Sequence, residues 1–301
     1  MSLTVNQIRN IVQKLDFFAS ENNIYITPFK SFEDDSTYEV WLIECALGKF
    51  VLKNAKNFEA EIYTTFFKNK INSVPQFLAE ITDGDTIYII IEYIKGETFC
   101  KCDRQSLQKA LDALILLQDK YWNDSTHNNI GYTFEKSMQS RINRGKYLCD
   151  EELEKVYQEF LSVYSKIPRT LCHDDLLPFN VIVGENSASL IDWEYAGILP
   201  YPTSIARLLA HTEENENALF YMTNEDKEFA KKYYYDNLVS KHDIPYDEYK
   251  YTVDLFFLYE YCEWIMLANK YPDADKERAA VYTRKAKFAL KQIDERNTKD
   301  E

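Results

Sequence analysis

The strongest chemical signal in this sequence is a set of three polar side chains within residues 172–194. Asp175 and Asn180 are five residues apart across a tight loop, and Asp192 ends a strand expected to pair back along residues 181–183. Because a hairpin of this kind brings the loop and the strand end together, one amide and two carboxylates converge. Mg²⁺ prefers such oxygen ligands and keeps its other positions for water and phosphate oxygens. The segment therefore predicts a magnesium site suited to phosphate chemistry.

The same segment resembles the aminoglycoside phosphotransferase and choline kinase family, the small-molecule branch of the protein-kinase-like fold. The resemblance rests on the pattern H-x-D-x-x-x-x-N, which begins at His173, and on I-D-W-E, which contains Asp192. It implies that Asp175 is the catalytic aspartate and that His173 orders the loop. It also implies that Asn180 and Asp192 are the metal ligands, and it spans about residues 25–211.

The chemistry of phosphoryl transfer accounts for these residue types. The transition state is loose, so the protein mainly positions the acceptor hydroxyl and neutralises charge on the phosphates. A carboxylate with an ordinary pKa near ~4 is a weak base, so we expect Asp175 to orient the hydroxyl first and take its proton late. The alternative is structural, with Asp175 capping a turn and His173 packed in the core.

A lysine at the end of the third expected strand matches the family's V-x-x-K position, whose ammonium contacts the α and β phosphates of the nucleotide. This lysine is Lys53, and a helix is expected shortly after it. The resemblance implies a glutamate partner on that helix. We prefer Glu61 as this partner, because its separation in sequence from the next strand fits the family's helix-to-strand connection. Glu59 remains the alternative partner. The alternative for Lys53 is a solvated strand end.

Two further segments are expected to hold the nucleotide. The strand that ends near Glu92 resembles the hinge of the fold, where backbone groups of Glu92, Tyr93 and Ile94 would bind the purine. Because side chains do not show which purine these groups bind, both ATP and GTP remain possible. The loop between the first two strands should cover the phosphates but contains no glycine. Ser36 and Thr37 are therefore expected to donate hydroxyl or backbone hydrogen bonds, with simple turn formation as the alternative.

The chain departs from the family pattern at two places. Asp174 stands beside the catalytic position, where glycine is commoner, and we expect it to face solvent or backbone. After the metal motif, where relatives commonly have an aspartate, the chain has Thr203 and Ser204. We expect Ser204 to cap the following helix.

The acceptor site is expected among the C-terminal helices. Glu213 belongs to a cluster of glutamates, Glu260 and Glu263 are three residues apart on one helix, and Trp264 adjoins them. Several carboxylates would suit a polyamine sugar, so an aminoglycoside-type acceptor is the first choice. Aromatic side chains lining the cleft would instead suit choline, and amino-sugar, homoserine and methylthioribose acceptors are further alternatives. The simpler interpretation is that the aromatics are core and the glutamates are solvated.

The amino-acid composition of the chain limits the classes of partner that it is expected to bind. The chain has 35 basic and 49 acidic residues, for a net charge of −14, so it gains nothing from the counterion release that drives nucleic-acid binding. Neither nucleic acid nor membrane is expected as a partner, and the protein is expected to be a monomer or homodimer. The six cysteines include no C-x-x-C pair, which disfavours zinc and favours reduced thiols in a cytoplasmic protein.

The pattern of elements predicts an α+β, bilobal protein-kinase-like fold. Residues 1–95 are expected to form a nucleotide-binding lobe with an antiparallel five-stranded sheet and one inserted helix, preceded by an amphipathic helix at 5–19. Residues 96–301 are expected to form a mainly helical catalytic and substrate-binding lobe. A short β-rich segment at 170–191 interrupts these helices and carries the motif.

The function that these features predict is an ATP- and Mg²⁺-dependent small-molecule kinase. It would transfer the γ-phosphoryl group to a hydroxyl of a small cationic or polyhydroxylated acceptor. With an antibiotic as the acceptor, this activity would confer antibiotic resistance. A nucleotide-binding pseudokinase is one alternative, because of the glycine-free loop. A two-carboxylate glycosidase is another, although it leaves Lys53 and Asn180 unexplained.

Overall fold

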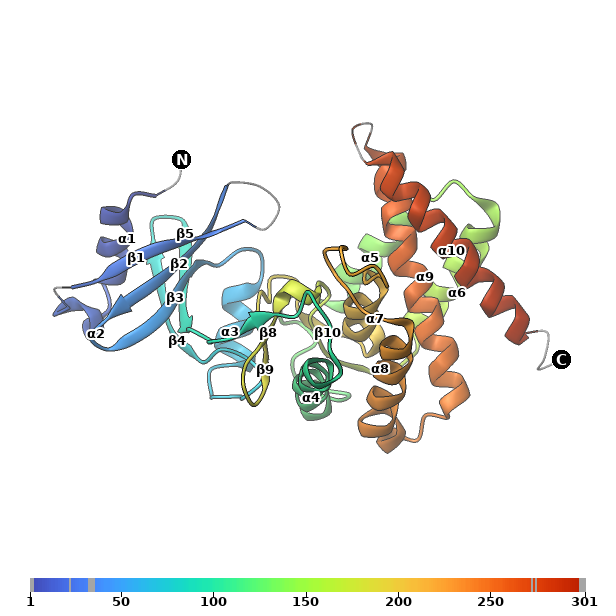
Figure 1. Cartoon of the computed structure of the whole chain (residues 1–301), viewed down its shortest axis with the longest axis horizontal. Helices are drawn as coiled ribbons and strands as arrows, with labels where there is room; N and C mark the ends of the chain where they lie inside the picture. The colour runs from blue at the N-terminus through green and yellow to red at the C-terminus, as the bar shows by residue number, and fades with distance from the viewer. Residues whose placement is uncertain (1–2, 22, 32–35, 272, 274, 298–301) are drawn as a thin grey trace.

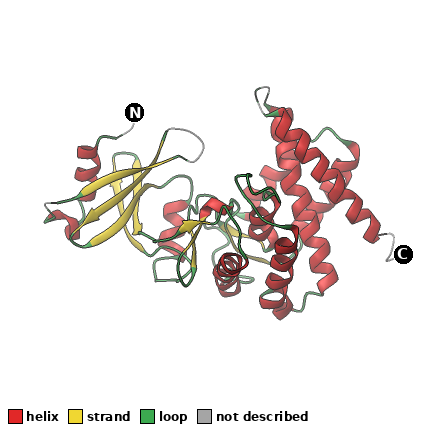
Figure 2. Ribbon diagram, viewed as in Figure 1, coloured by secondary structure: helices red, strands yellow, loops and turns green. Residues whose placement is uncertain are grey.

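The computed structural model describes residues 3–21, 23–31, 36–271, 273 and 275–297. An N-terminal antiparallel sheet lies beside a larger helical part, and the two are joined through short strands and α3 (Figures 1 and 2). The expected five-stranded sheet with one inserted helix and a helical C-terminal part is confirmed. No described helix is both long enough and apolar enough to cross a membrane.

The N-terminal sheet is antiparallel throughout, in the order β1-β2-β3-β5-β4. Its strands are β1 (Tyr25–Lys30), β2 (Thr37–Cys45), β3 (Gly48–Asn54), β4 (Phe77–Asp83) and β5 (Thr86–Glu92). The predicted turn between β2 and β3 is present, and Gly48 begins β3 with a φ of 127°, a conformation that favours glycine.

Both faces of this sheet are covered. Because side chains alternate along a strand, Tyr88 and Ile90 of β5 pack with α1 (Val5–Val12) and α2 (Asp16–Ala19), whereas Ile89 and Ile91 pack toward α3 (Glu59–Phe66). The prediction of one helix over 5–19 is wrong, because a turn at 13–15 separates α1 from α2. The inserted helix, α3, is 8 residues long.

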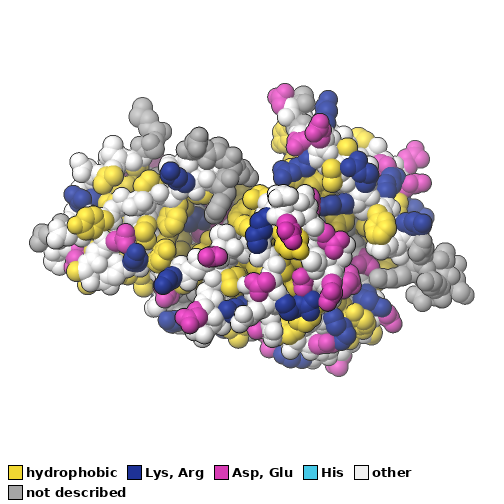
Figure 3. Space-filling model, viewed as in Figure 1, with side chains coloured by type: hydrophobic (Ala, Val, Ile, Leu, Met, Phe, Trp, Pro, Cys, Tyr) yellow, Lys and Arg dark blue, Asp and Glu magenta, His cyan; other side chains and the backbone are white. Residues whose placement is uncertain are grey.

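The helical part contains seven long helices within the described residues. They are α4 (Arg104–Lys120), α5 (Phe134–Gly145), α6 (Glu151–Tyr164), α7 (Pro202–Ala210), α8 (Asn224–Asn237), α9 (Tyr246–Lys270) and α10 (Lys276–Asn297). Helix α9 packs against α6, α7 and α10. Helix α4 buries four leucines along one face, Leu107, Leu111, Leu114 and Leu117. In Figure 3, acidic and basic side chains are interspersed over this part.

Two small sheets position the motif. In one, β7 (Arg169–Cys172) pairs with β10 (Gly197–Pro200); in the other, β8 (Val181–Val183) lies between β6 (Glu97–Thr98) and β9 (Ala188–Leu190). The polypeptide between β7 and β8 is the loop that carries Asp175, and a short 3₁₀ turn at Pro178–Asn180 ends it. The predicted hairpin of β8 and β9 therefore brings Asp192 back toward this loop.

Candidate active site

His173 ties the loop to the strand that leads to Asp192. Its side chain is buried, and its Nε2 donates a hydrogen bond to the backbone carbonyl of Ile191 at 2.6 Å. The indole of Trp193 packs on the imidazole, with ring centroids 4.7 Å apart. This placement suits the predicted loop-ordering role, because any shift of the loop would break a buried hydrogen bond.

Asn180 holds the loop from its other end. Its Nδ2 donates to the backbone carbonyl of Asp175 at 2.9 Å, and its backbone carbonyl accepts from the N–H of Ile191 at 2.9 Å. The amide nitrogen is thereby engaged, so the side chain presents its oxygen to the site. An oxygen in this position, on a residue only 2% exposed, suits a hard cation such as Mg²⁺.

Lys53 reaches across from β3 to the metal motif. Its Nζ donates to Oε1 of Glu59 at 2.9 Å and to Oδ1 of Asp192 at hydrogen-bonding distance, and lies 4.0 Å from Oε1 of Glu194. The preference for Glu61 as its partner is wrong. Oε2 of Glu61 instead accepts the backbone N–H of Gly131 at 2.9 Å. The open alternative, Glu59, makes the contact.

The electrostatics of this group favour a lysine that stays charged. Burial opposes the charge on Lys53, but attraction to Glu59 and Asp192 raises its pKa above the ordinary value. Burial raises the pKa of Glu59 to about 7, against the lowering effect of Lys53. Burial also opposes ionisation of Asp192, yet Lys53 lowers the pKa of this carboxyl below its usual value.

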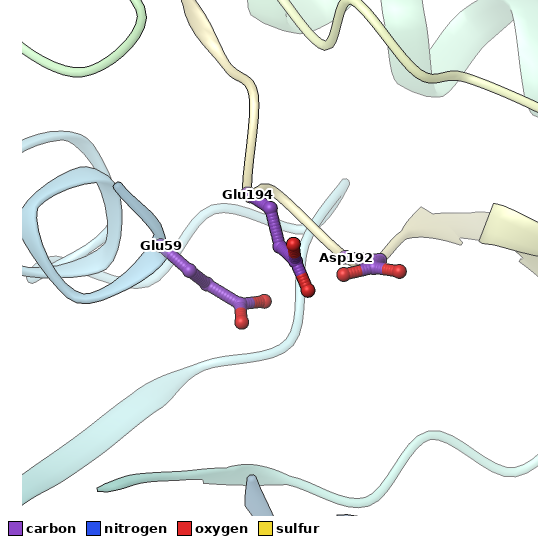
Figure 4. A group of neighbouring side chains, drawn as sticks. All are labelled: Glu59, Asp192 and Glu194. Carbon is purple, nitrogen blue, oxygen red and sulfur yellow. The ribbon is translucent and has the colours of Figure 1, made fainter. Parts of the chain in front are cut away.

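Three of these carboxylates form a potential cation site. Oxygens of Glu59, Asp192 and Glu194 lie within 4.8 Å of one another, and Figure 4 shows Glu59 and Glu194 facing into the same space beside Asp192. Together with Asn180, they offer the oxygen ligands that Mg²⁺ requires. Sequence reasoning missed Glu194, although its position two residues after Asp192 in the motif was a usable signal.

Asp175, the predicted catalytic aspartate, contacts an arginine that sequence reasoning missed. Nη2 and Nε of Arg207, on α7, lie 2.9 and 3.2 Å from Oδ1 of Asp175. Burial raises the pKa of Asp175, and the guanidinium opposes that rise. Both contacts are to one oxygen, so Oδ2 is the atom that can accept a hydrogen bond from an acceptor hydroxyl.

Asp175 opens onto a cavity of about 270 Å³. Predicted acceptor residues Glu260 and Glu263 line it, and both are buried on α9. Its remaining lining residues are Tyr132, Arg144, Asp174, Tyr195, Arg207 and Tyr259. Two predicted acceptor residues are elsewhere: Glu213 is exposed, 3.8 Å from Lys285, and Trp264 stacks on Tyr282.

Residues 27–233 match the model of a phosphotransferase enzyme family (APH). The chain belongs to this family. Membership confirms the predicted enzyme class, a small-molecule phosphotransferase, and the predicted family. No sequence among curated proteins matches the chain significantly.

Solved structures share the fold across the whole chain. A choline kinase from Cryptosporidium parvum Iowa II is 16% identical, with a TM-score of 0.67 and coverage of 98% of this chain and 97% of that one. The choline kinase LicA from Streptococcus pneumoniae is 13% identical, with a TM-score of 0.61 and coverage of 95% and 99%. Amicoumacin kinase hAmiN, solved with AMP-PNP and Ca²⁺, is 12% identical, with a TM-score of 0.61 and coverage of 96% of each chain. The protein-kinase-like fold is therefore confirmed.

The structure explains the two departures from the family pattern, at Asp174 and at Ser204. Asp174 does not face solvent, because its Oδ1 accepts from Nη2 of the buried Arg141 at 2.6 Å. Ser204 does not cap α7; its Oγ accepts the backbone N–H of His173 at 2.9 Å. The expected helix cap was wrong, and the hydroxyl anchors the catalytic loop instead.

The predicted nucleotide contacts belong to the ends of two internal strands of the sheet, β2 and β5, and to the residues beside them. Ser36 and Thr37 are exposed where β2 begins, and residues 32–35 of the same predicted loop lie outside the described residues. The N–H of Glu92 donates to the carbonyl of Gln76 at 2.9 Å, so it belongs to the sheet. Tyr93 and Ile94 follow in the link to β6, outside any strand.

That link packs closely against the helical part. A Cβ on Gly96 would lie 2.4 Å from the carbonyl oxygen of Val183. Only glycine allows this approach, which brings the predicted hinge beside the β8–β9 hairpin.

Proposed function

We propose that this member of the phosphotransferase family transfers the γ-phosphoryl group of ATP, with Mg²⁺, to a hydroxyl of a small acceptor. The observation that carries the proposal is the contact between Lys53 and Asp192, beside a loop in which Asn180 binds the backbone of Asp175 and of Ile191, and Asp175 lines a cavity. Each residue has the type and the position that phosphoryl transfer needs.

The residues of the site have separate roles in the proposed phosphoryl transfer. Lys53 binds the α and β phosphates, and Glu59 keeps its ammonium aimed into the cleft. Asn180 and Asp192 would hold a magnesium ion, which would neutralise charge on the phosphates. Asp175 accepts a hydrogen bond from the acceptor hydroxyl, aligns its oxygen with the γ-phosphorus, and receives its proton as the new P–O bond forms.

The proposed division of the molecule follows the sequence boundaries. Residues 1–95 bind the nucleotide, through Ser36, Thr37 and the backbone of 92–94, and residues 96–301 bind the acceptor and carry the catalytic loop. The six cysteines all carry free thiols, in keeping with a cytoplasmic location, where ATP is plentiful.

Nucleotide binding is tested by thermal shift with ATP and with GTP, each with and without Mg²⁺. We expect Mg²⁺-dependent stabilisation that is lost in Asp192→Ala, because the variant removes a metal ligand. Stabilisation by neither nucleotide would contradict the proposal. A comparison of the thermal shifts with ATP and with GTP shows which purine is preferred.

Catalysis is tested by Asp175→Asn, which keeps the shape of the side chain but cannot take a proton. We expect turnover, followed by ADP release with an identified acceptor, to fall by about 10²–10⁴-fold. The thermal shift with Mg²⁺-ATP should remain. Wild-type turnover by Asp175→Asn would contradict the mechanism, and nucleotide binding without turnover of any acceptor would favour the pseudokinase alternative.

A further inference from the structure

The cavity beside Asp175 limits what the acceptor can be. A transferable hydroxyl must reach Oδ2 of Asp175, so the rest of the acceptor lies among the lining residues. At about 270 Å³ the cavity is near the small end of the ~300–1,000 Å³ range of ligand pockets. It therefore suits a compact acceptor.

The carboxylates of this cavity already have cationic partners. Asp174 is paired with the buried Arg141 at 2.6 Å. Oε2 of Glu260 lies 2.8 Å from Nη1 of Arg207 and 3.0 Å from Nε2 of His211. Both members of the Glu260–Arg207 pair are largely shielded from water, so the pair is costly to break.

Glu263 is paired in the same way. Its Oε2 accepts from Nη1 of Arg207 at 3.0 Å, and its Oε1 accepts from Arg144 and from the hydroxyl of Tyr259. Every carboxylate that lines the cavity among the described residues thus contacts an arginine, although Asp175, Glu260 and Glu263 share Arg207. A polyamine would have to compete with these guanidinium groups for the carboxylates.

Arg144 is the lining cation with unused hydrogen-bonding capacity. Its side chain is 44% exposed, and its Nη1 faces Glu263 and Tyr259. No described residue accepts a hydrogen bond from its Nε or Nη2. These two groups form one edge of the planar guanidinium, which is the geometry that binds a carboxylate through two parallel hydrogen bonds.

We propose that the acceptor is a small hydroxylated carboxylate, with its carboxylate bound by Arg144 and its hydroxyl at Asp175. This inference rests on the proposed kinase function. In the transfer, the hydroxyl oxygen bonds to the γ-phosphorus of ATP while the bond from that phosphorus to the β,γ-bridging oxygen breaks. The hydroxyl proton passes to Asp175, and the products are ADP and a phosphate monoester.

The test is an acceptor panel built from matched pairs, with ADP release as the readout. L-homoserine and D-glycerate carry the carboxylate, 2-amino-1,4-butanediol and glycerol replace it with a hydroxymethyl group, and choline and kanamycin represent the cationic alternatives. We expect a carboxylate-bearing compound to be turned over with a kcat/KM at least about 10-fold above its hydroxymethyl counterpart, since hydrogen bonds to charged groups are the strong ones.

Arg144→Gln removes the charge and should raise KM for that acceptor by about 10–100-fold, with KM for ATP unchanged. Arg284→Gln, which removes an exposed arginine from α10, is the matched control and should change neither constant.

Three outcomes would overturn the inference: no carboxylate-bearing acceptor turned over, preference for the hydroxymethyl or cationic compounds, or full activity of Arg144→Gln. Turnover of choline or kanamycin alone would leave the kinase function standing. Absence of Mg²⁺-dependent nucleotide binding would instead reject the kinase function itself.

Discussion

Lys53 sits among three carboxylates, and this crowding explains its role. One ammonium cannot neutralise Glu59, Asp192 and Glu194 together, so the group retains negative charge that a metal ion would relieve. Glu59 is fully buried, which makes it the fixed member of the group. The lysine is therefore held in place by Glu59 and shared with Asp192 on the other side of the cleft.

Replacing each candidate partner of Lys53 separates their roles. We expect Glu59→Gln to raise KM for ATP by about 10-fold or more, because it removes a charge-assisted hydrogen bond from a buried lysine. Glu61→Gln is the matched control on the same helix. It keeps an oxygen for the N–H of Gly131 and should change KM for ATP by less than about twofold. Equal effects of the two variants would contradict the assignment.

At this scale the sequence predicted the residues that follow a local pattern. Asp175, Asn180 and Asp192 belong to one short segment whose hairpin brings them together. Which of Glu59 and Glu61 pairs with Lys53 depends on the conformation of the chain where α3 begins. Asn57 takes a left-handed φ of 49° and donates to Glu194 rather than capping the helix. That contact spans 137 residues of sequence, so no local pattern could indicate it.

At the scale of elements, α7 anchors the loop that carries Asp175 at two points. Ser204 accepts the N–H of His173, and Arg207, three residues later on the same helix face, binds the carboxylate of Asp175. The sequence predicted the helix but not these contacts, because they join segments more than 30 residues apart. Sequence reasoning also missed α5, which is mostly polar and buries little along its length.

Removing the Ser204 anchor should affect catalysis more than nucleotide binding. Ser204→Ala leaves a buried N–H unsatisfied at a cost of about 1–3 kcal/mol, and the loop that carries Asp175 loses its fixed geometry. We expect kcat to fall by about 10-fold, with KM for ATP nearly unchanged.

Thr203→Ala provides the control, since its hydroxyl donates to the carbonyl of Pro200 and not to the loop. It should lower Tm without lowering kcat. A Ser204→Ala variant that lost only Tm would show that the anchor is structural alone.

At the scale of the whole molecule, one buried ionic cluster links the catalytic loop to the long C-terminal helices. Glu260 of α9 holds Arg207 of α7, which in turn holds Asp175. Burial opposes ionisation of Glu260, but Arg207 and His211 lower its pKa from 4.5 to about 2. The sequence predicted that Glu260 faces the acceptor site, and its arginine partner became visible only when α7 and α9 were packed together.

This cluster predicts how stability depends on pH. Because the pKa of Glu260 is lower in the folded chain than in the unfolded chain, unfolding takes up a proton below about pH 4.5, and the free energy of unfolding falls as the pH falls toward 2. The pKa difference corresponds to roughly 3 kcal/mol at neutral pH, of which about 2 kcal/mol is lost by pH 3. Urea titrations between pH 7 and pH 3 would measure this loss.

Glu260→Gln cannot titrate at this position, so it isolates the contribution of one carboxyl from acid unfolding in general. We expect the variant to be less stable than the wild type at pH 7 and to approach it as the pH falls, because the wild type alone loses the Glu260–Arg207 attraction. A stability difference that stays constant from pH 7 to pH 3 would contradict the lowered pKa, and with it the claim that this ion pair joins α7 to α9.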